Sequence, residues 1–390
     1  MMKFTFFMPT KILFGAGKLK SLHKEVMPGK KALIVTSNGQ SAKKYGYIDR
    51  VINELNQSNC DHHIFNGIEP NPLKESVMAG ARAAKENNCD FILALGGGSV
   101  MDASKAIALM ATNDGDLWDY VKFGTGKNIK AKNKCLPLIC VTTTAGTGSE
   151  ADDGGVITNP ETNEKTVVGG KDMFPVISVV DPELMITVPK KETAFQGFDA
   201  LFHCIEGYLS NAGNVVNDML TIDSIQKISK NLPIAIKEPE NIDARSGVAY
   251  GNTIAGIIMS IGGVTSHHSL EHALSAYHQE LPHGAGLIML SLSYFSKWIE
   301  KGAVLDRFID LARALGHENP TRAEDFIDAL RDLQVKCEVD NLKMSDYGIK
   351  KDEFEKMAHN AKDCMGMLFK VDRVDLSIED CVSIFESAYK

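Results

Sequence analysis

The sequence lacks any run of 18 uninterrupted apolar residues, so no membrane-spanning helix is expected. It also lacks a long basic run, and its net charge of −8 argues against nucleic acid or an anionic membrane as the main partner. None of its eight cysteines forms a Cys-x-x-Cys pair, so we interpret them as reduced and mostly buried. The apolar segment before Pro9 is too short for a signal-peptide core. Together these absences predict a cytoplasmic protein.

At 390 residues the chain is too long for one ordinary core, which favours two domains. The first half alternates short apolar runs with amphipathic stretches, an order that predicts a parallel, Rossmann-like sheet with helices on both faces. After residue 182 the apolar residues recur every three or four positions, which predicts helices. The sequence therefore predicts an α/β domain over residues 1–182 and an all-α domain over residues 183–390. Strands are expected at 31–36, 63–65, 90–95, 136–141 and 175–180, helices at 41–57, 73–88 and 100–110, and a hairpin at 155–168.

Three consecutive glycines separate a predicted buried strand from a predicted helix. Gly96, Gly97, Gly98 and Ser99 would expose backbone N–H groups at a helix N-terminus, an arrangement that suits a phosphate or pyrophosphate. Asp102 follows in the first turns of that helix. The alternative is a tight turn without a ligand. No Gly-x-Gly-x-x-Gly fingerprint follows the first predicted strand of the α/β domain, so an ordinary Rossmann domain is not predicted.

A second polar loop follows the next predicted strand, at residues 142–149. It contains Thr143, Thr144 and Thr147, together with glycines that make it flexible. The carboxyl ends of parallel strands lie at one edge of the sheet, where open α/β sheets bind ligands. Two such loops on consecutive strand ends favour a ligand over the empty-turn alternative.

Histidines gather in one part of the predicted helical domain, where five of the 11 lie between residues 267 and 283. Upstream, Asp199 and His203 are four residues apart, so on a helix they would share a face and could bind one ion. Imidazole and carboxylate groups together suit a borderline divalent ion such as Zn²⁺ or Fe²⁺. Taken alone, however, Asp199 and His203 are better explained as a hydrogen-bonded pair on a helix.

Residue types alone do not decide which of the five later histidines bind an ion. His268 and His272 are also four residues apart, and the stretch between them matches His-x-x-Glu-His, the inverted zinc-peptidase motif. His283 directly precedes Gly284 at a predicted helix start. A zinc peptidase is therefore a rival interpretation, although it leaves the glycine loop and Asp199 unexplained.

The order of these motifs resembles the iron-containing (group III) alcohol dehydrogenase family over nearly the whole chain. Residues 9–17 resemble the family's opening hairpin, 96–105 its nucleotide-phosphate loop, and 142–150 the loop beside the nicotinamide. Two further motifs, at 197–208 and 268–284, resemble its metal-binding motifs. The resemblance implies a metal-dependent, NAD(P)-linked alcohol dehydrogenase or aldehyde reductase. Hydride would pass between nicotinamide C4 and a small alcohol or aldehyde.

The resemblance also implies a role for each motif residue. Asp199, His203, His268 and His283 would bind one divalent metal, with Fe²⁺ expected and Zn²⁺ as the alternative, and His272 would be a proton relay. The expected partners are a small alcohol or aldehyde and further copies of the chain in a homodimer or larger homo-oligomer. Two rival interpretations are a lyase of the dehydroquinate synthase type and a non-enzymatic metal-binding protein. The cofactor, NADP or NAD, is expected to contact Ser37, Gly39, Gly96, Gly97, Gly98, Ser99, Asp102, Thr143, Thr144 and Thr147.

The sequence departs from the family pattern in three places. Many members carry an Asp after the first strand that holds the cofactor ribose, whereas this chain has Ser37 there, with Lys43 and Lys44 close by. A carboxylate would repel a 2′-phosphate and a serine would not, so we hypothesise that NADP(H) is accepted. The acidic pair at 152–153 has no functional interpretation, and residues 363–369 lack the family's common Asn-Pro end.

Overall fold

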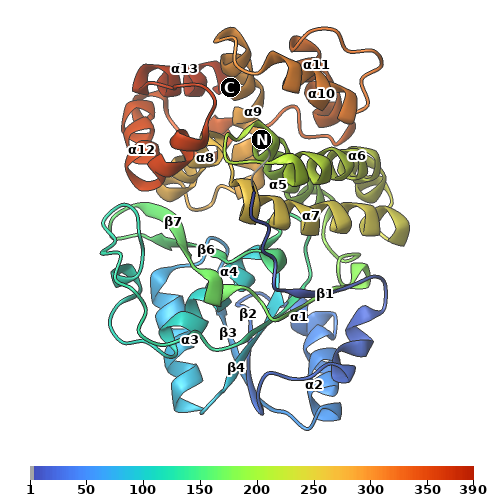
Figure 1. Cartoon of the computed structure of the whole chain (residues 1–390), viewed down its shortest axis with the longest axis vertical. Coiled ribbons are helices and arrows are strands. Elements are labelled where there is room, and N and C mark those ends of the chain that lie inside the picture. The colour runs from blue at the N-terminus through green and yellow to red at the C-terminus, as the bar shows by residue number, and fades with distance from the viewer. Residues whose placement is uncertain (1–3) are drawn as a thin grey trace. The chain divides into compact units, whose positions relative to one another are not determined.

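The computed structural model describes residues 4–390, which form two compact units (Figure 1). One unit is Met8–Thr187 and contains the sheet. The other is Val188–Lys390 together with residues 4–7, and its regular structure is helical. The predicted fold class, an α/β part followed by a helical part, is confirmed.

Six parallel strands form the main sheet, and their order is β1-β8-β5-β4-β2-β3. The predicted hairpin is present as β6 and β7, which pair antiparallel. The expected opening hairpin is wrong, because β1 pairs in parallel with β8, a strand more than 160 residues further on in the chain. The strands are β1 (Lys11–Phe14), β2 (Lys31–Ser37), β3 (Asp61–Ile68), β4 (Phe91–Gly96), β5 (Leu138–Thr142), β6 (Gly154–Asn159), β7 (Glu164–Gly169) and β8 (Ile177–Val180).

Helices cover both faces of the sheet (Figure 1). The helix predicted at 41–57 is two helices, because Gly46 adopts a left-handed conformation (φ 69°) that interrupts it. Alternate residues of each central strand enter different cores. On β4, Ile92 and Ala94 pack in the core formed with α3 and α4, whereas Leu93 packs in the core formed with α2. The helices are α1 (Ser41–Lys44), α2 (Tyr47–Gln57), α3 (Lys74–Glu86) and α4 (Gly98–Met110).

The strand order reverses at β2, which pairs with β3 on one side and β4 on the other. In open α/β sheets, ligands bind outside the carboxyl ends of the strands at such a reversal. Strand β2 ends at Ser37 and its neighbour β4 ends at Gly96, where the glycine loop begins. The topology therefore brings two of the predicted cofactor segments to one edge of the sheet.

A buried lysine explains an acidic residue that the sequence left without a role. The Lys105 side chain has no exposed surface, and its Nζ lies 2.5 Å from Asp152 Oδ1. The same ammonium group donates to Ser149 Oγ at 2.8 Å and to the Gly154 carbonyl at 2.7 Å. Breaking a buried ion pair by removing one partner typically costs about 3–5 kcal/mol, because the other charge is left unpaired. Asp152 is thus the counter-ion that allows Lys105 to be buried under the second loop.

The helical unit is built around α5, α8 and α9, which carry the candidate metal ligands. Helices α6 and α7 pack on α5, and α12 packs on α8. Helix α12 contains the segment that lacks the family's Asn-Pro end, and its backbone leaves helical geometry there, at Met365 (φ −133°). The helices are α5 (Lys190–Leu209), α6 (Val215–Lys237), α7 (Ile242–Gly262), α8 (Ser266–Tyr277), α9 (His283–Glu300), α10 (Leu305–Ala314), α11 (Glu324–Lys336), α12 (Phe354–Val371) and α13 (Ile378–Ala388).

Within residues 4–390, no single helix has both the length and the apolar character needed to cross a membrane. Helices α7 and α8 satisfy the criterion of length and composition only when taken together, and the chain bends by 107° between them.

Candidate metal centre

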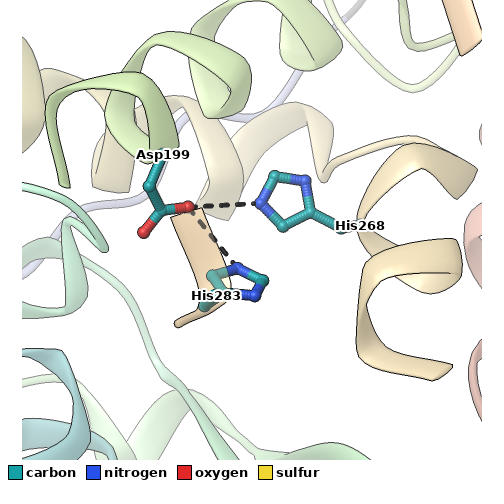
Figure 2. Close-up of side chains that lie close together, drawn as sticks. All are labelled: Asp199, His268 and His283. Carbon is teal, nitrogen blue, oxygen red and sulfur yellow. Dashed lines mark ion pairs between the residues drawn. The ribbon is translucent and has the colours of Figure 1, made fainter. Parts of the chain in front are cut away.

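One carboxylate oxygen lies at the centre of the site. Asp199 Oδ1 is 3.6 Å from His203 Nε2 and 3.5 Å from both His268 Nε2 and His283 Nε2. Helix α5 supplies Asp199 and His203 from one face, α8 supplies His268, and His283 is the first residue of α9. Figure 2 shows Asp199, His268 and His283 converging from three separate helices. The structure therefore brings the four predicted ligands together.

The spacing of these atoms suits a metal ion better than a hydrogen-bonded cluster. Four nitrogen and oxygen ligands about 2.1 Å from a common tetrahedral centre lie roughly 3.4 Å apart, close to the three distances from Asp199 Oδ1. The ligand atoms of Asp199, His268 and His283 lie within 4.8 Å of one another. Asp199 Oδ1 and His268 Nε2 are buried and have no hydrogen-bond partner among the residues that the structure describes. Buried polar atoms without partners are costly unless a cation satisfies them. The donor set and its geometry thus fit a divalent ion such as Fe²⁺ or Zn²⁺.

A fully buried carboxylate, Glu206, fixes the orientation of one ligand. Its Oε1 lies 2.7 Å from His268 Nδ1 and 2.8 Å from His267 Nδ1. Its Oε2 accepts hydrogen bonds from the Thr265 amide and hydroxyl, both at 3.0 Å. A carboxylate behind the distal nitrogen of a histidine sets its tautomer and raises its basicity as a ligand. Glu206 therefore directs His268 Nε2 toward Asp199.

A second fully buried carboxylate, Glu271, holds His283 in the same way, through a hydrogen bond between His283 Nδ1 and Oε2. Two glycines allow the helices to approach closely enough for this contact. A Cβ atom on Gly284 would lie 2.2 Å from the Phe195 carbonyl oxygen of α5, and one on Gly286 would lie 2.7 Å from Glu271 Cγ. Bare backbone at the start of α9 is thus a condition for bringing His283 to the site.

Charge interactions keep the carboxylates of Asp199 and Glu206 ionised and favour the protonated form of His268. Burial raises the pKa of the Asp199 carboxyl, but the His203 and His283 rings lower that pKa more, so it lies below its usual range. Burial opposes the charged form of Glu206 as well, yet His268 and His267 hold its pKa well below its usual range. Burial lowers the pKa of His268, but Glu206 and Asp199 together raise that pKa to about 10. Because His268 must lose a proton to coordinate, metal binding should release protons.

The remaining clustered histidines take different positions. His272, the predicted proton relay, is buried, with its ring centroid 5.4 Å from that of His283 and 6.4 Å from that of His268. His278 lies outside the ligand group and pairs with Glu353 at 3.1 Å. His272 is therefore beside the candidate ligands, and His278 is a matched control from the same histidine cluster.

The predicted cofactor loops lie against each other in the sheet unit. The Thr143 amide donates to the carbonyl of Gly96 at 3.0 Å. A Cβ atom on Gly98 would lie 2.1 Å from Thr147, which shows how closely the glycine loop approaches the second loop. Gly97 has the same relation to Thr144, at 2.8 Å. The sequence predicted these loops on consecutive strand ends. The absence of side chains at Gly97 and Gly98 explains how the two loops approach each other so closely.

The other predicted cofactor residues are spread over the same edge of the sheet. Ser37 ends β2, and Gly39 follows it on the surface. Ser99 is half-buried in the first turn of α4. Asp102 accepts hydrogen bonds from Ser149 Oγ at 2.6 Å and from the Val156 amide at 3.0 Å. Burial raises the pKa of Asp102 to about 6. Asp102 thus ties α4 to the second loop and to β6.

Reasoning from the sequence did not assign a role to Glu206 or Glu271. A helical repeat could have found both. Glu206 follows Asp199 by seven residues and His203 by three, and Glu271 follows His268 by three, so each shares a helix face with a ligand. The contacts that Glu206 makes with Thr265 and His267 could not be predicted from helical spacing, because they depend on how α5 and α8 pack.

Comparison with known proteins places both units in one family. The family model described as "Iron-containing alcohol dehydrogenase" matches residues 9–182, and "Fe-containing alcohol dehydrogenase family, C-terminal" matches residues 193–389. The chain is similar to "Probable NADH-dependent butanol dehydrogenase 1" of Bacillus subtilis, with 35% identity over 93% of this chain and 94% of that protein. It is also similar to "NADH-dependent butanol dehydrogenase A" of Clostridium acetobutylicum, with 33% identity over the full length of both.

A solved structure has the same fold over its whole length. The crystal structure of an archaeal halo-thermophilic alcohol dehydrogenase from a Red Sea brine pool superposes with a TM-score of 0.94 at 32% identity. The match covers 100% of this chain and 99% of that one.

The ligand assignment predicts a contrast between two histidines of the same cluster. Loss of a hydrogen-bond partner behind a ligand typically lowers metal affinity roughly 10–100-fold. His268→Ala should lower the affinity for Fe²⁺ or Zn²⁺ by more than that, because it removes a ligand atom. His278→Ala should leave the affinity unchanged. Chelator competition followed by elemental analysis measures both. Equal metal content in the two purified variants would contradict the assignment.

Proposed function

This chain belongs to the iron-containing alcohol dehydrogenase family, and we propose that it interconverts small primary alcohols and their aldehydes with a nicotinamide cofactor. It is an oxidoreductase of the alcohol dehydrogenase class. The observation that carries the proposal is that His203, His268 and His283 surround Asp199 Oδ1, because an ion held by these residues could activate a substrate oxygen.

In this proposal each side chain has a separate task. Asp199 and the three imidazoles would hold the ion, which when bound supplies the Lewis acidity that polarises the substrate oxygen. Glu206 and Glu271 keep His268 and His283 in the tautomer that directs Nε2 at the ion. When bound, the nicotinamide supplies the hydride acceptor or donor. The first turn of α4 and the glycine loop offer backbone N–H groups to its pyrophosphate.

The zinc-peptidase interpretation of His268 to His272 is not retained. Its motif requires the glutamate for catalysis, but Glu271 is fully buried and its carboxylate is bonded to His283. The family models also match both units, including the glycine loop that a peptidase leaves unexplained. The same matches supersede the lyase and the non-enzymatic metal-binding protein. A homo-oligomer in the cytoplasm stays a prediction of the sequence.

Butanol and butanal are the first substrates to test, because similar proteins carry the name butanol dehydrogenase. The apoenzyme should be loaded separately with Fe²⁺ and Zn²⁺ and then supplied with C2 to C6 aldehydes and either NADH or NADPH. We expect cofactor oxidation at 340 nm with at least one metal and little turnover without added metal. Absence of turnover for every aldehyde with both metals would contradict the proposed function.

The end of β2 supports use of NADP(H) as well as NAD(H). Ser37 occupies the strand end at the reversal of the sheet, and Lys43 and Lys44 are exposed at the last turn of α1. No carboxylate lies between residues 37 and 48 to repel a 2′-phosphate. In the aldehyde assay, kcat/KM for NADPH should therefore be no more than about tenfold below kcat/KM for NADH, and it can exceed it. Ser37→Asp should shift the preference toward NADH. A hundredfold NADH preference in the wild type would end the hypothesis.

His272 is proposed as the group that exchanges a proton with the substrate hydroxyl. His272→Gln should lower kcat by about 100-fold or more, the usual contribution of a general acid or base, while the metal content stays that of the wild type. The pH dependence of kcat should lose the limb due to the imidazole. His278→Gln is the control and should keep the wild-type profile. Unchanged kcat in His272→Gln would remove the relay from the mechanism.

A further inference from the structure

A chain of three hydroxyl groups joins two buried carboxylates inside the helical unit. Thr265 Oγ1 lies 3.0 Å from Glu206 Oε2 and 3.0 Å from the Tyr294 hydroxyl. The Tyr294 hydroxyl lies 3.0 Å from Ser266 Oγ, which is 2.6 Å from Asp372 Oδ2. Asp372 is 8% exposed, and the other four residues have no exposed surface. These groups therefore satisfy one another without help from bulk water.

The number of hydrogens in this chain does not match the number of links. There are four links, from Glu206 through Thr265, Tyr294 and Ser266 to Asp372. Each hydroxyl carries one hydrogen, and an ionised carboxylate carries none. If both carboxylates were ionised, three hydrogens would have to serve four links, and one buried oxygen pair would face each other without a hydrogen. One additional proton, on either carboxylate, completes every link in a single direction.

The Glu206 end has no need of that proton. Its two oxygens already receive four donors: the amide and hydroxyl of Thr265, and ring nitrogens of His267 and His268. Four accepted hydrogen bonds use the full capacity of a carboxylate and stabilise its negative charge.

The Asp372 end is much less well supplied. Among residues 4–390, its carboxyl group has hydrogen bonds only with Ser266, through the amide at 3.0 Å and the hydroxyl at 2.6 Å. The cations near it are engaged elsewhere, since Lys362 donates to the Leu376 carbonyl and Arg373 donates to backbone carbonyls of α5 and its C-cap. A negative charge is therefore less stable on Asp372 than on Glu206.

We propose that Asp372 is held as a neutral carboxylic acid whose proton completes the hydrogen-bond chain and thereby positions Glu206 behind His268. Asp372 is a positioning residue and touches neither substrate nor ligand. Its hydroxyl donates to Ser266 Oγ, Ser266 to Tyr294, Tyr294 to Thr265, and Thr265 to Glu206. The connection to the metal rests on the proposed function, whereas the protonation state of Asp372 does not.

The surroundings of Asp372 agree with this assignment. Burial raises the pKa of Asp372 to about 8, the hydrogen bonds from Ser266 lower it in part, and the Glu206 charge raises it further. Lys362 of α12 acts in the opposite direction but more weakly. The other titratable groups facing Asp372 are the Tyr294 phenol of α9 and the Cys381 thiol of α13, whose pKa values burial raises, so both are neutral at pH 7.

A raised pKa has a definite consequence for stability. An acid whose folded-state pKa exceeds its unfolded-state value stabilises the fold at low pH, and that contribution is lost as pH rises toward the folded-state value. For Asp372 the loss runs from about pH 4 to about pH 8. An asparagine at this position carries a permanent donor and acceptor, so it would keep the hydrogen bonds and avoid the loss.

Asp372→Asn is the decisive variant. Its amide group should donate to Ser266 Oγ and its carbonyl should accept from the Ser266 amide. We expect Asp372→Asn to raise Tm by a few degrees (about 2–4 °C) at pH 8.5 and by less at pH 5.5, with metal affinity within about threefold of the wild type. Asp372→Ala, which breaks the chain, should weaken metal binding roughly tenfold. A lower Tm for Asp372→Asn at both pH values would show that Asp372 is ionised and would overturn the proposal.

A matched control comes from the other unit. Asp181 is also buried, but its oxygens accept from the amides of Gly17, Leu19 and Glu183, and Arg50 lies 3.8 Å away. Within residues 4–390 no hydroxyl chain reaches it. Asp181→Asn should therefore lower Tm at both pH values, the opposite sign to Asp372→Asn. Infrared spectra give a direct readout at pH 7.5, where Asp102 is ionised: the carbonyl band of a protonated carboxylic acid should be present in the wild type and lost in Asp372→Asn. Absence of that band from the wild type would also overturn the proposal.

Tyr294→Phe tests whether the hydrogen-bond chain is the reason why Asp372 keeps its proton. Without the phenol only the two outer links remain, and the hydroxyls of Thr265 and Ser266 can serve both with no added proton. The gain in Tm from Asp372→Asn should therefore shrink in the Tyr294→Phe background, which is a non-additivity expected for groups in one network. An unchanged gain would show that burial alone acts on Asp372, and the chain would be removed from the proposal. None of these measurements depends on turnover, so they stand apart from the test of the proposed function.

Discussion

The burial of a carboxylate among imidazole rings is the constraint on which the helical unit depends. Asp199 sits on α5 with its Oδ1 at nearly equal distance from rings on three helices, and that oxygen has no hydrogen bond within residues 4–390. A buried charge without a partner is expensive, so the helices that surround it must present the atoms that hold a cation. Gly284 is placed to permit this, because any side chain there would collide with the backbone of α5. The close packing of α9 on α5 is thus also the condition for bringing the ligand atoms together.

The sheet unit also contains a buried charge that must be compensated, but it compensates that charge differently. There the buried charge is a lysine, Lys105, and the protein itself supplies the compensating carboxylate and two further acceptors. Neutralising the charge internally leaves that site closed and structural, and its effect is to fix the second loop against α4. Asp199, by contrast, is surrounded by imidazole rings, which can give up their protons and bind a cation together with the carboxylate. A lysine paired with a carboxylate indicates a structural role, whereas a carboxylate among imidazoles with perturbed pKa values indicates a binding site.

What the sequence could predict follows from the range of the interactions involved. The strands, the helical half and the pairing of Asp199 with His203 depend on neighbours within a few residues, and periodicity reports them. The helix at 41–57 was divided by Gly46, which the amphipathic pattern does not register. The opening hairpin was wrong because β1 chooses β8, a partner distant in the chain. Asp152 had no interpretation because its cation lies 47 residues away. Resemblance to a family supplied the ligand set that spacing had left open.

The arrangement of charge around the metal site explains why the hydrogen-bond chain from Glu206 to Asp372 is needed behind the ligands and their carboxylate partners. Two carboxylates, Glu206 and Glu271, are fully buried directly behind the ligands. Each stabilises the imidazole in front of it, but each also raises the cost of any further negative charge nearby. A third ionised carboxylate at Asp372 would lie at the end of this buried hydrogen-bond chain, and the nearby Lys362 ammonium already donates to the Leu376 carbonyl. Placing a proton there lets the hydroxyl groups of the chain point their hydrogens toward Glu206 without adding a further negative charge near the ligands.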